Sequence, residues 1–256
     1  MGAIHIKYPA LTLRAGKRAA AHIRQQGLQP ADIATLPGAA GGPKGIGLQG
    51  LDLALFGDWL PRAPRQRSLI GASIGSWRFA SACLPDPVAG IRRLGELYTS
   101  QRYAKGVSMK EVSQSCRQLL HDLLQGEDSA ILANPLYHLN IVVVKSHGLL
   151  VHDRKGALGL GLSAVIGNNL LGRQRLARHF ERLIIHDARS QPPLGKLDDF
   201  RSHFHPLQPA NLRQSLMASA SIPLVMEAVR EIPGIGHGSF RDGGLLDYHL
   251  DLPYAG

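Results

Sequence analysis

The chain has 256 residues, enough to bury a sizeable core, and a single α/β domain over 1–256 is its simplest organisation. A hydrophobic fraction of 44% excludes intrinsic disorder as a description of the whole. The formal net charge of +10 favours anionic partners such as nucleic acid, anionic lipid or an acidic protein, but carries no information about the fold.

The two cysteines, Cys83 and Cys116, fit neither a disulfide framework nor a zinc pattern, and indicate buried thiols in a reducing compartment. No stretch is long and apolar enough to span a bilayer, and residues 1–21 lack the apolar core of a signal peptide. We therefore expect a soluble protein that is cytoplasmic unless it is exported by a route without a cleaved signal. No His, Asp or Glu spacing is typical of a metal site, so no metal or other cofactor is expected.

Strand-like and helix-like periods alternate along the chain, which predicts an α/β sandwich. The first strand is followed by a glycine cluster at 38–47, and a basic, proline-bearing loop is expected at 61–67. Repeats and heptads are absent from the sequence, and nothing in it marks a linker between two domains. Strands are predicted over 31–37, 68–72, 140–146 and 183–186, and helices over 48–60, 74–83, 88–100, 109–125 and 211–220.

The segment from Gly71 to Gly75 follows a predicted strand and opens a predicted helix, which is the context of a nucleophile elbow. In such an elbow Ser73 sits on a sharp, strained turn, and the residues two before and two after it must lack side chains. Gly71 and Gly75 meet that requirement. The alternative is a purely structural, glycine-flanked turn with a buried hydroxyl, but the strand before it and the helix after it favour a catalytic serine.

A second strand-to-helix turn spans Ala40 to Gly45, and its glycines predict an anion cradle of exposed backbone N–H groups. A phosphate-binding P-loop is excluded because Pro43 precedes Lys44 and Gly45 follows it. The run 45–50 matches the dinucleotide fingerprint, yet the strand ends before it and no acid lies near position 70. An oxyanion hole is the better assignment, with a plain tight turn as the alternative.

The third element is Asp242 followed by Gly243 and Gly244, late in the chain. An aspartate before two glycines lies on a turn with little side-chain crowding, which suits a carboxylate that must face a nucleophile. The same pattern is also typical of an ordinary Asp-Gly turn.

Taken in this order, the three motifs resemble those of the patatin-like phospholipase family. That family carries a Gly-Gly-Gly-x-Arg/Lys-Gly oxyanion loop, a Gly-x-Ser-x-Gly elbow and a distant Asp-Gly-Gly or Asp-Gly-Ala. Here Ala40 occupies the first glycine slot and Lys44 the basic slot, while 217–223 resembles an Ala-Ser-rich helix end running into proline. The resemblance spans about 31–247. Family members usually continue past the acid motif, so a missing C-terminal portion is an open alternative.

The resemblance implies a three-layer α/β/α sandwich with a mainly parallel central sheet, and a serine lipid acyl hydrolase acting on a lipid or ester substrate. Ser73 would attack the ester carbonyl, and Asp242 would serve directly as its base without a histidine. The N–H groups of Gly41 and Gly42 would hold the oxyanion, in a loop completed by Lys44 and Gly45. An acyl-enzyme would then be hydrolysed by water.

Other functions compete with this interpretation. An ordinary α/β-hydrolase triad would use Ser73 with Asp187 or Asp242 and His249, in the chain order that such enzymes show. A nucleic-acid-binding module is disfavoured because the basic residues are dispersed and aromatics make up only 5%. A non-catalytic scaffold is disfavoured by the joint presence of all three motifs.

One further stretch suggests contact with a membrane surface. Residues 157–171 are apolar and glycine-rich, and we expect them to form a flexible lip over the site. A basic helix is expected after them, and it would attract anionic head groups. The alternative is a core helix with a solvated basic face. The basic residues concerned are Arg173, Arg175, Arg178 and Arg182.

Overall fold

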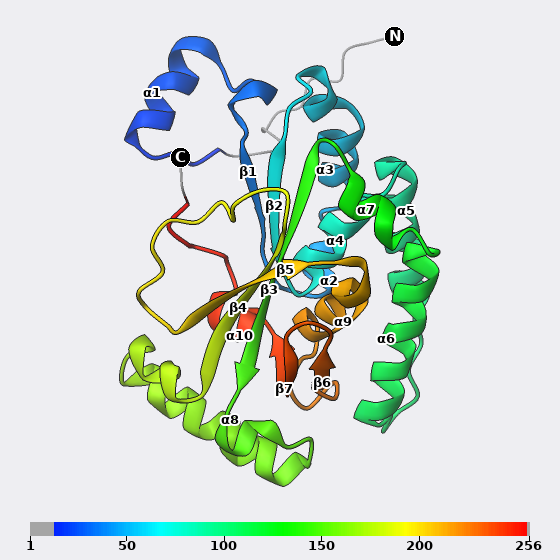
Figure 1. Cartoon of the computed structure of the whole chain (residues 1–256), viewed down its shortest axis with the longest axis vertical. Helices are drawn as coiled ribbons and strands as arrows, with labels where there is room; N and C mark the ends of the chain where they lie inside the picture. The colour runs from blue at the N-terminus through cyan, green and yellow to red at the C-terminus, as the bar shows by residue number, and fades with distance from the viewer. Residues whose placement is uncertain (1–12, 255–256) are drawn as a thin grey trace.

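The computed structural model describes residues 13–254 and has an α/β fold around a seven-stranded sheet (Figure 1). Residues 1–12, on which the expectation about a signal peptide mainly rests, lie outside this range, as do 255 and 256. The strands are β1 (Thr35–Gly38), β2 (Arg67–Ala72), β3 (Tyr137–Ser146), β4 (Phe180–Asp187), β5 (Ser202–Leu207), β6 (Val229–Ile232) and β7 (Gly236–Asp242).

The long strand β3 organises the sheet. Strands β1, β2 and β3 run parallel, while β4 and β5 form a second parallel pair that is antiparallel to β3. Because β4 occupies one edge of β3 along 140–146, β2 and β7 must share the other edge. Strand β2 pairs with 137–142 and β7, running the opposite way, pairs with 143–145. The two strands therefore meet end to end beside the middle of β3.

Alternate side chains of the strands face two separate cores, as the pleat requires. Leu69 and Ile141 face the core beneath the larger helical layer, whereas Ile70 and Val142 face the opposite side. The larger layer consists of α3 (Gln49–Ala54), α4 (Ile74–Ala82), α5 (Pro87–Ser100), α6 (Met109–Leu124), α7 (Asp128–Ala133) and α9 (Pro209–Ser219), and the other side carries α8 (Lys155–Leu170), α10 (Gly244–Asp247) and the C-terminal segment (Figure 1).

The remaining helices are α1 (Lys17–Gln26) and α2 (Pro43–Ile46). The predicted α/β architecture is thus confirmed. A central sheet lies between two outer layers, and the first three strands of this sheet are parallel.

Two predicted elements are shorter than expected. The strand predicted over 31–37 begins only at Thr35, because Pro30–Asp32 form a 3-10 turn whose capping box satisfies the local N–H groups. The helix predicted over 48–60 stops being α-helical at Ala54 and continues as a π-helical turn at Leu55–Trp59. A 3-10 turn then follows at Pro61, which has no N–H to continue the helix.

The C-terminal segment packs onto the sheet. Leu250 and Leu252 are buried against Ile70 and Val142 in the smaller core, and the hydroxyl of Tyr254 donates to the carbonyl of Leu250 at 2.7 Å. The described residues after the acid motif therefore cover one face of the sheet.

Candidate active site

Ser73 stands on the turn between β2 and α4 in a strained backbone conformation. Its φ is 55° and its ψ is −130°, a region that residues with a side chain seldom occupy. The carbonyl of Ser73 accepts hydrogen bonds from the N–H and the hydroxyl of Ser76, at 3.0 and 2.7 Å. These bonds fix the sharp turn that an elbow requires.

The glycines of the elbow are required by close backbone contacts. A Cβ on Gly71 would overlap with the backbone of Ser76, and one on Gly75 would overlap with the carbonyl of Gly38 at the end of β1. The predicted close approach of the elbow strand and its helix is therefore present at Gly71, whereas at Gly75 the helix approaches the neighbouring strand β1.

A second serine, which the sequence analysis did not single out for a role, holds the elbow to β3. The N–H of Ser73 donates to the hydroxyl oxygen of Ser219 at 2.9 Å, and that hydroxyl donates to the carbonyl of Val142 at 2.7 Å. Ser219 is fully buried at the end of α9. Its only sequence signal is the Ala-Ser-rich helix end at 217–223.

The sheet register brings Asp242 next to the elbow. Ala72, the last residue of β2, pairs with Val142, and Asp242, the last residue of β7, pairs with the adjacent Val143. The two strands thus deliver the nucleophile and the acid to neighbouring positions on one edge of β3. A Cβ on Gly243 would overlap with the carbonyl of Val142, so the chain can turn away there only with glycine.

The carboxylate of Asp242 is buried and lightly solvated. Burial raises the pKa of Asp242 to about 6, while the approach of the Ser73 hydroxyl and the N–H of Gly244 lower it. The Gly244 N–H donates to Asp242 Oδ1 at 2.7 Å, and the Asp242 N–H donates to the carbonyl of Ser221. A carboxyl with a pKa near 6 is ionised at neutral pH and is a stronger base than an exposed aspartate.

The glycine loop presents two free donors to this site. The N–H of Lys44 donates to the carbonyl of Gly41, and the N–H of Gly45 donates to the carbonyl of Gly42. Among the described residues the N–H groups of Gly41 and Gly42 donate to no acceptor. Both have positive φ, 145° and 52°, which favours glycine at each position.

The other expected members of the loop have structural roles. The N–H groups of Lys44 and Gly45 are used inside the loop, and a Cβ on Gly45 would overlap with Ile74 of the elbow helix. Ala40, which departs from the family pattern, donates its N–H to the carbonyl of Tyr248 at 2.9 Å. The run 45–50, which matches a dinucleotide fingerprint, is divided between α2 and α3 rather than forming one turn.

Two cavities meet at Ser73 and share Gly42, Pro43 and Ile222 in their walls. The first, of about 350 Å³, we call the acid-side cavity; it is further lined by Ala40, Gly41, Pro223, Asp242, Gly244, Leu245 and Tyr248. The second, of about 330 Å³, we call the apolar cavity; it is further lined by Ile74, Trp77, Tyr98, Gln101, Tyr103, Val112, Cys116, Ala220, Val225 and Met226.

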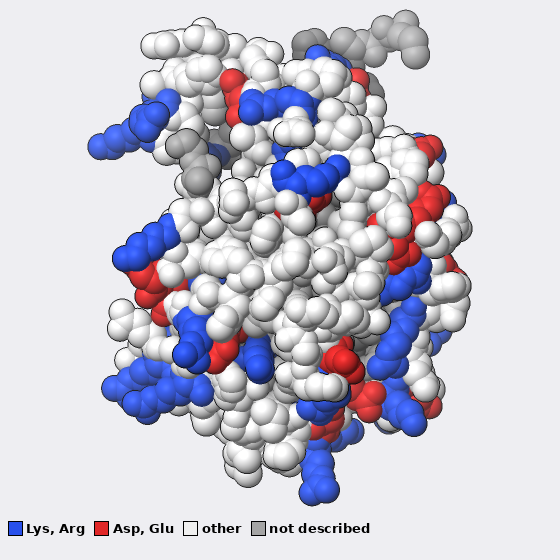
Figure 2. Space-filling view, in the orientation of Figure 1, with Lys and Arg blue, Asp and Glu red and all other residues white. Residues whose placement is uncertain are grey.

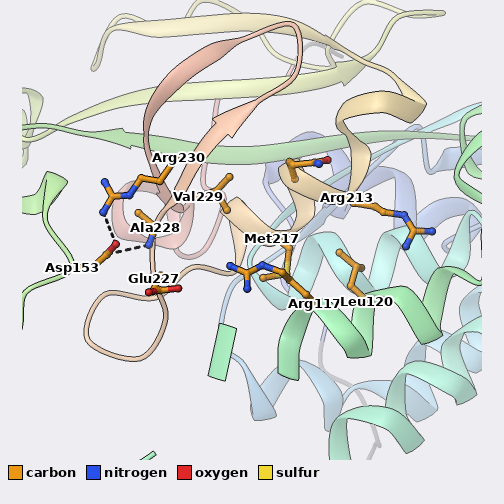
Figure 3. Close-up of a pocket in the computed structure, with 10 residues that line it drawn as sticks. Arg117, Leu120, Asp153, Arg213, Met217, Glu227, Ala228, Val229 and Arg230 are labelled. Carbon is orange, nitrogen blue, oxygen red and sulfur yellow. Dashed lines mark hydrogen bonds and ion pairs between the residues drawn. The ribbon is translucent and has the colours of Figure 1, made fainter. Parts of the chain in front are cut away.

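A third and larger cavity, of about 540 Å³, lies beyond Met217 and does not include Ser73 (Figure 3). Arginines from α6, α9 and β6 surround it. Arg230 is paired with Asp153, and Arg213 is paired outside the cavity with Asp128 at 2.6 Å. We call this the distal cavity.

The structure does not assemble the alternative triad. Asp187 ends β4 one residue beyond the pair His186–Asn140, and β4 lies on the other side of β3 from the elbow strand β2. Burial raises the pKa of Asp187, but its hydrogen bonds with Arg189 outweigh this and leave the pKa below the usual range. No histidine of the described residues lines either cavity at Ser73, and the exposed His249 packs edge-on against Tyr248.

The expected lip is wrong in two respects. Residues 155–170 form the regular helix α8, and none of them lines a cavity that contains Ser73. The basic residues after it form a 3-10 turn at Arg173–Arg178, and Arg182 belongs to β4. Arg182 is fully buried and paired with Asp247 at 2.6 Å and with Asp199 at 2.8 Å, so it offers no charge to a ligand.

Charged side chains of both signs are interspersed on the face shown in Figure 2, as the dispersed basic residues of the sequence suggest. Within residues 13–254, no group of three or more His, Cys, Asp or Glu side chains is arranged to hold a metal ion. None of the helices in that range is both long enough and apolar enough to cross a bilayer.

Comparison of the chain with protein-family models, curated proteins and solved structures gives no significant match. A functional assignment must therefore rest on the geometry of the site itself.

Proposed function

We propose that this chain is a serine acyl-ester hydrolase of the patatin type, with Ser73 as nucleophile and Asp242 as its base. The observation that carries the proposal is the head-to-head meeting of β2 and β7 on one edge of β3, which places the two residues side by side. The unpaired N–H groups of Gly41 and Gly42 supply the third requirement, donors for an oxyanion.

In the first half of the reaction, Ser73 Oγ attacks the ester carbonyl carbon while Asp242 accepts the hydroxyl proton. The carbonyl oxygen becomes an oxyanion held by Gly41 and Gly42. Collapse of this intermediate breaks the ester C–O bond, and the proton on Asp242 passes to the departing alcohol. Ser73 is left as an acyl ester.

In the second half, water enters beside Asp242, which takes one of its protons as the water oxygen attacks the acyl carbon. Collapse of the second intermediate releases the carboxylic acid and returns the proton from Asp242 to Ser73. Because a carboxylate is a weak base for an alcohol, the raised pKa of Asp242 and the oxyanion donors must together supply much of the rate.

The proposed substrates are lipid or simple carboxylic esters, and no metal or cofactor takes part in these steps. Hydrolysis of p-nitrophenyl butyrate tests the proposal with wild type, Ser73→Ala and Asp242→Asn. We expect kcat to fall at least about a thousandfold in each variant. A fluorophosphonate should add one label to wild type by intact mass and none to Ser73→Ala.

The variant His249→Ala distinguishes the dyad from a triad. We expect it to retain most of the wild-type activity, since His249 is exposed and lines neither cavity at Ser73. A loss of several orders of magnitude would favour the triad. Activity that survives Ser73→Ala would refute the proposal as a whole.

A further inference from the structure

The position of the base decides which part of an ester enters which cavity. This step rests on the proposed function. After Asp242 takes the proton of Ser73, it must return that proton to the departing alcohol oxygen, so this oxygen must lie on the Asp242 side. Asp242 lines only the acid-side cavity of the two. The acyl group is therefore directed to the opposite side of Ser73, into the apolar cavity.

The wall of the apolar cavity suits a hydrocarbon chain. Among residues 13–254 no ionised side chain lines it, and its wall includes the buried Trp77, Val112 and Met226. Burial raises the pKa of the Cys116 thiol, and burial raises the pKa of Tyr103 to about 12, so both groups stay neutral at physiological pH.

The size of the cavity limits the length of that chain. A methylene group has about the volume of a water molecule, whose share of the liquid is about 30 Å³. A cavity of about 330 Å³ therefore holds a chain on the order of ten carbons.

We propose that the apolar cavity is an acyl-binding site for medium-length chains, and that the acid-side cavity receives the alcohol. Cys116, on α6, and Tyr103, on the segment before it, determine the usable length of the chain. The distal cavity takes no part in selecting the length of the acyl chain. The buried Met217 of α9 lies in its wall (Figure 3).

The test is a series of p-nitrophenyl esters, from butyrate through decanoate to myristate, kept below micelle formation. We expect kcat/KM of the wild type to rise about tenfold or more from butyrate to decanoate, because each added methylene leaves water. No further rise is expected at myristate, because the cavity is then filled.

Two substitutions should move this preference in opposite directions. Cys116→Trp fills the cavity and should lower the ratio of decanoate to butyrate hydrolysis about tenfold. Tyr103→Ala removes a side chain that is 43% exposed, so the fold tolerates it, and should raise the ratio of myristate to decanoate. The matched control is Arg117→Trp, which puts the same bulk on the next residue of α6, toward the distal cavity.

The outcomes separate this inference from the proposed function. A flat chain-length profile, with butyrate hydrolysis still dependent on Ser73, overturns the acyl site and leaves the hydrolase in place. The same holds if Arg117→Trp and Cys116→Trp change the profile alike in folded protein, or if Tyr103→Ala changes nothing. Absence of any Ser73-dependent hydrolysis overturns both.

Discussion

Burial of the Asp242 carboxylate lowers the stability of the folded protein at neutral pH. Its pKa is raised from 3.8 to about 6, so the folded state holds a proton that the unfolded state has already lost between these values. The contribution of Asp242 to stability therefore falls as pH rises from about 4 to 6, by about 3 kcal/mol in all.

We accordingly expect Asp242→Asn to abolish activity and yet to stabilise the protein. A neutral amide of the same shape can still accept the Gly244 N–H, and its Tm at pH 8 should exceed that of wild type by about 5 °C. Thermal unfolding followed by circular dichroism measures this. The difference should disappear below about pH 3, where the wild-type carboxyl is protonated in both the folded and the unfolded state. An unchanged Tm at pH 8 would contradict the interpretation.

The same pKa sets the pH dependence of the reaction. Only the ionised Asp242 can accept a proton from Ser73, so kcat/KM should rise about tenfold per pH unit below the pKa and level off above it. For the free enzyme we expect the bend near pH 6. A bend near pH 4 would mean that water reaches the Asp242 carboxyl, which is buried in the structure. The p-nitrophenyl esters described above serve as substrates for this pH profile.

Ser219 should affect catalysis through the backbone of Ser73. In Ser219→Ala the buried N–H of Ser73 loses its acceptor, which costs about 1–3 kcal/mol of stability and loosens the elbow, so kcat should fall. Ser221→Ala is the matched control, since its hydroxyl only donates to the carbonyl of Met217 within the same segment. Denaturant unfolding and ester hydrolysis of the two variants should differ, and equal losses would argue against a positioning role for Ser219.

At the scale of elements, the junction of β1, β2 and α4 depends on the absence of a side chain at Gly75. In Gly75→Ala the new Cβ would overlap with the carbonyl of Gly38, so we expect a loss of several kcal/mol or failure to fold. Gly159→Ala tests the opposite case. Gly159 lies inside α8, and a Cβ at this position would have no atom within 4 Å. Alanine should therefore stabilise the protein by about 0.5–1 kcal/mol.

Denaturant unfolding of these two variants gives the comparison directly. If Gly75→Ala left the free energy of unfolding unchanged or raised it, the close packing at the elbow would be wrong. The elbow could be predicted from sequence in part because Gly71 is required by a contact with Ser76 inside one strand–turn–helix unit. Gly75 is required by the neighbouring strand β1, a contact that the motif alone does not describe.

Elements whose ends depend on local chemistry were predicted well, and those that depend on distant contacts were not. The elbow strand and α4 follow from a continuous apolar run and a glycine turn. Strand β5, with His203 and His205 alternating along an edge, has no apolar pattern to reveal it. Helix α8 was expected as a flexible lip because its glycines mask a helical period, and only packing against Leu150 and Leu176 shows its inner side.

For the molecule as a whole, the pairing of β7 with β3 could not be foreseen from the sequence. The motif around Asp242 identified a candidate base, but nothing in the chain indicated that β7 would continue the edge of β3 left open where β2 ends. That register, rather than any motif, explains why Ser73 and Asp242 are neighbours although they lie far apart in the chain. The Ser219 bridge was missed for the same reason.

The outer layer also presents an apolar surface close to the site. Helix α8 leaves Leu160, Ile166 and Leu170 exposed at 67%, 62% and 83%, and Leu171 follows at 67%. Its inner residues belong to the same cluster as Leu245, which lines the acid-side cavity. Exposed basic side chains flank this surface, with Arg154 and Lys155 at the start of the helix and Arg175 and Arg178 after its end.

We expect this surface to bind membranes that carry anionic lipid. A helix of this kind lies in the interface with its leucines among the acyl chains, and each nearby basic residue adds about 1 kcal/mol with anionic head groups. Co-sedimentation with phosphatidylserine-containing vesicles should exceed that with neutral vesicles and should weaken as salt is raised. Exchanging Leu160 and Leu170 for glutamine should reduce binding at every salt concentration.

The control is Leu48→Gln, which removes an exposed leucine (43%) from the segment before α3 and should leave vesicle binding unchanged. Exchanging Arg175 and Arg178 for glutamine should lower binding only to anionic vesicles, because the apolar contribution remains. Hydrolysis of soluble butyrate should be unaffected in all of these variants, since none of the residues lines a cavity at Ser73. Binding that is indifferent to both lipid charge and salt would refute the membrane role of α8 while leaving the chemistry of Ser73 and Asp242 intact.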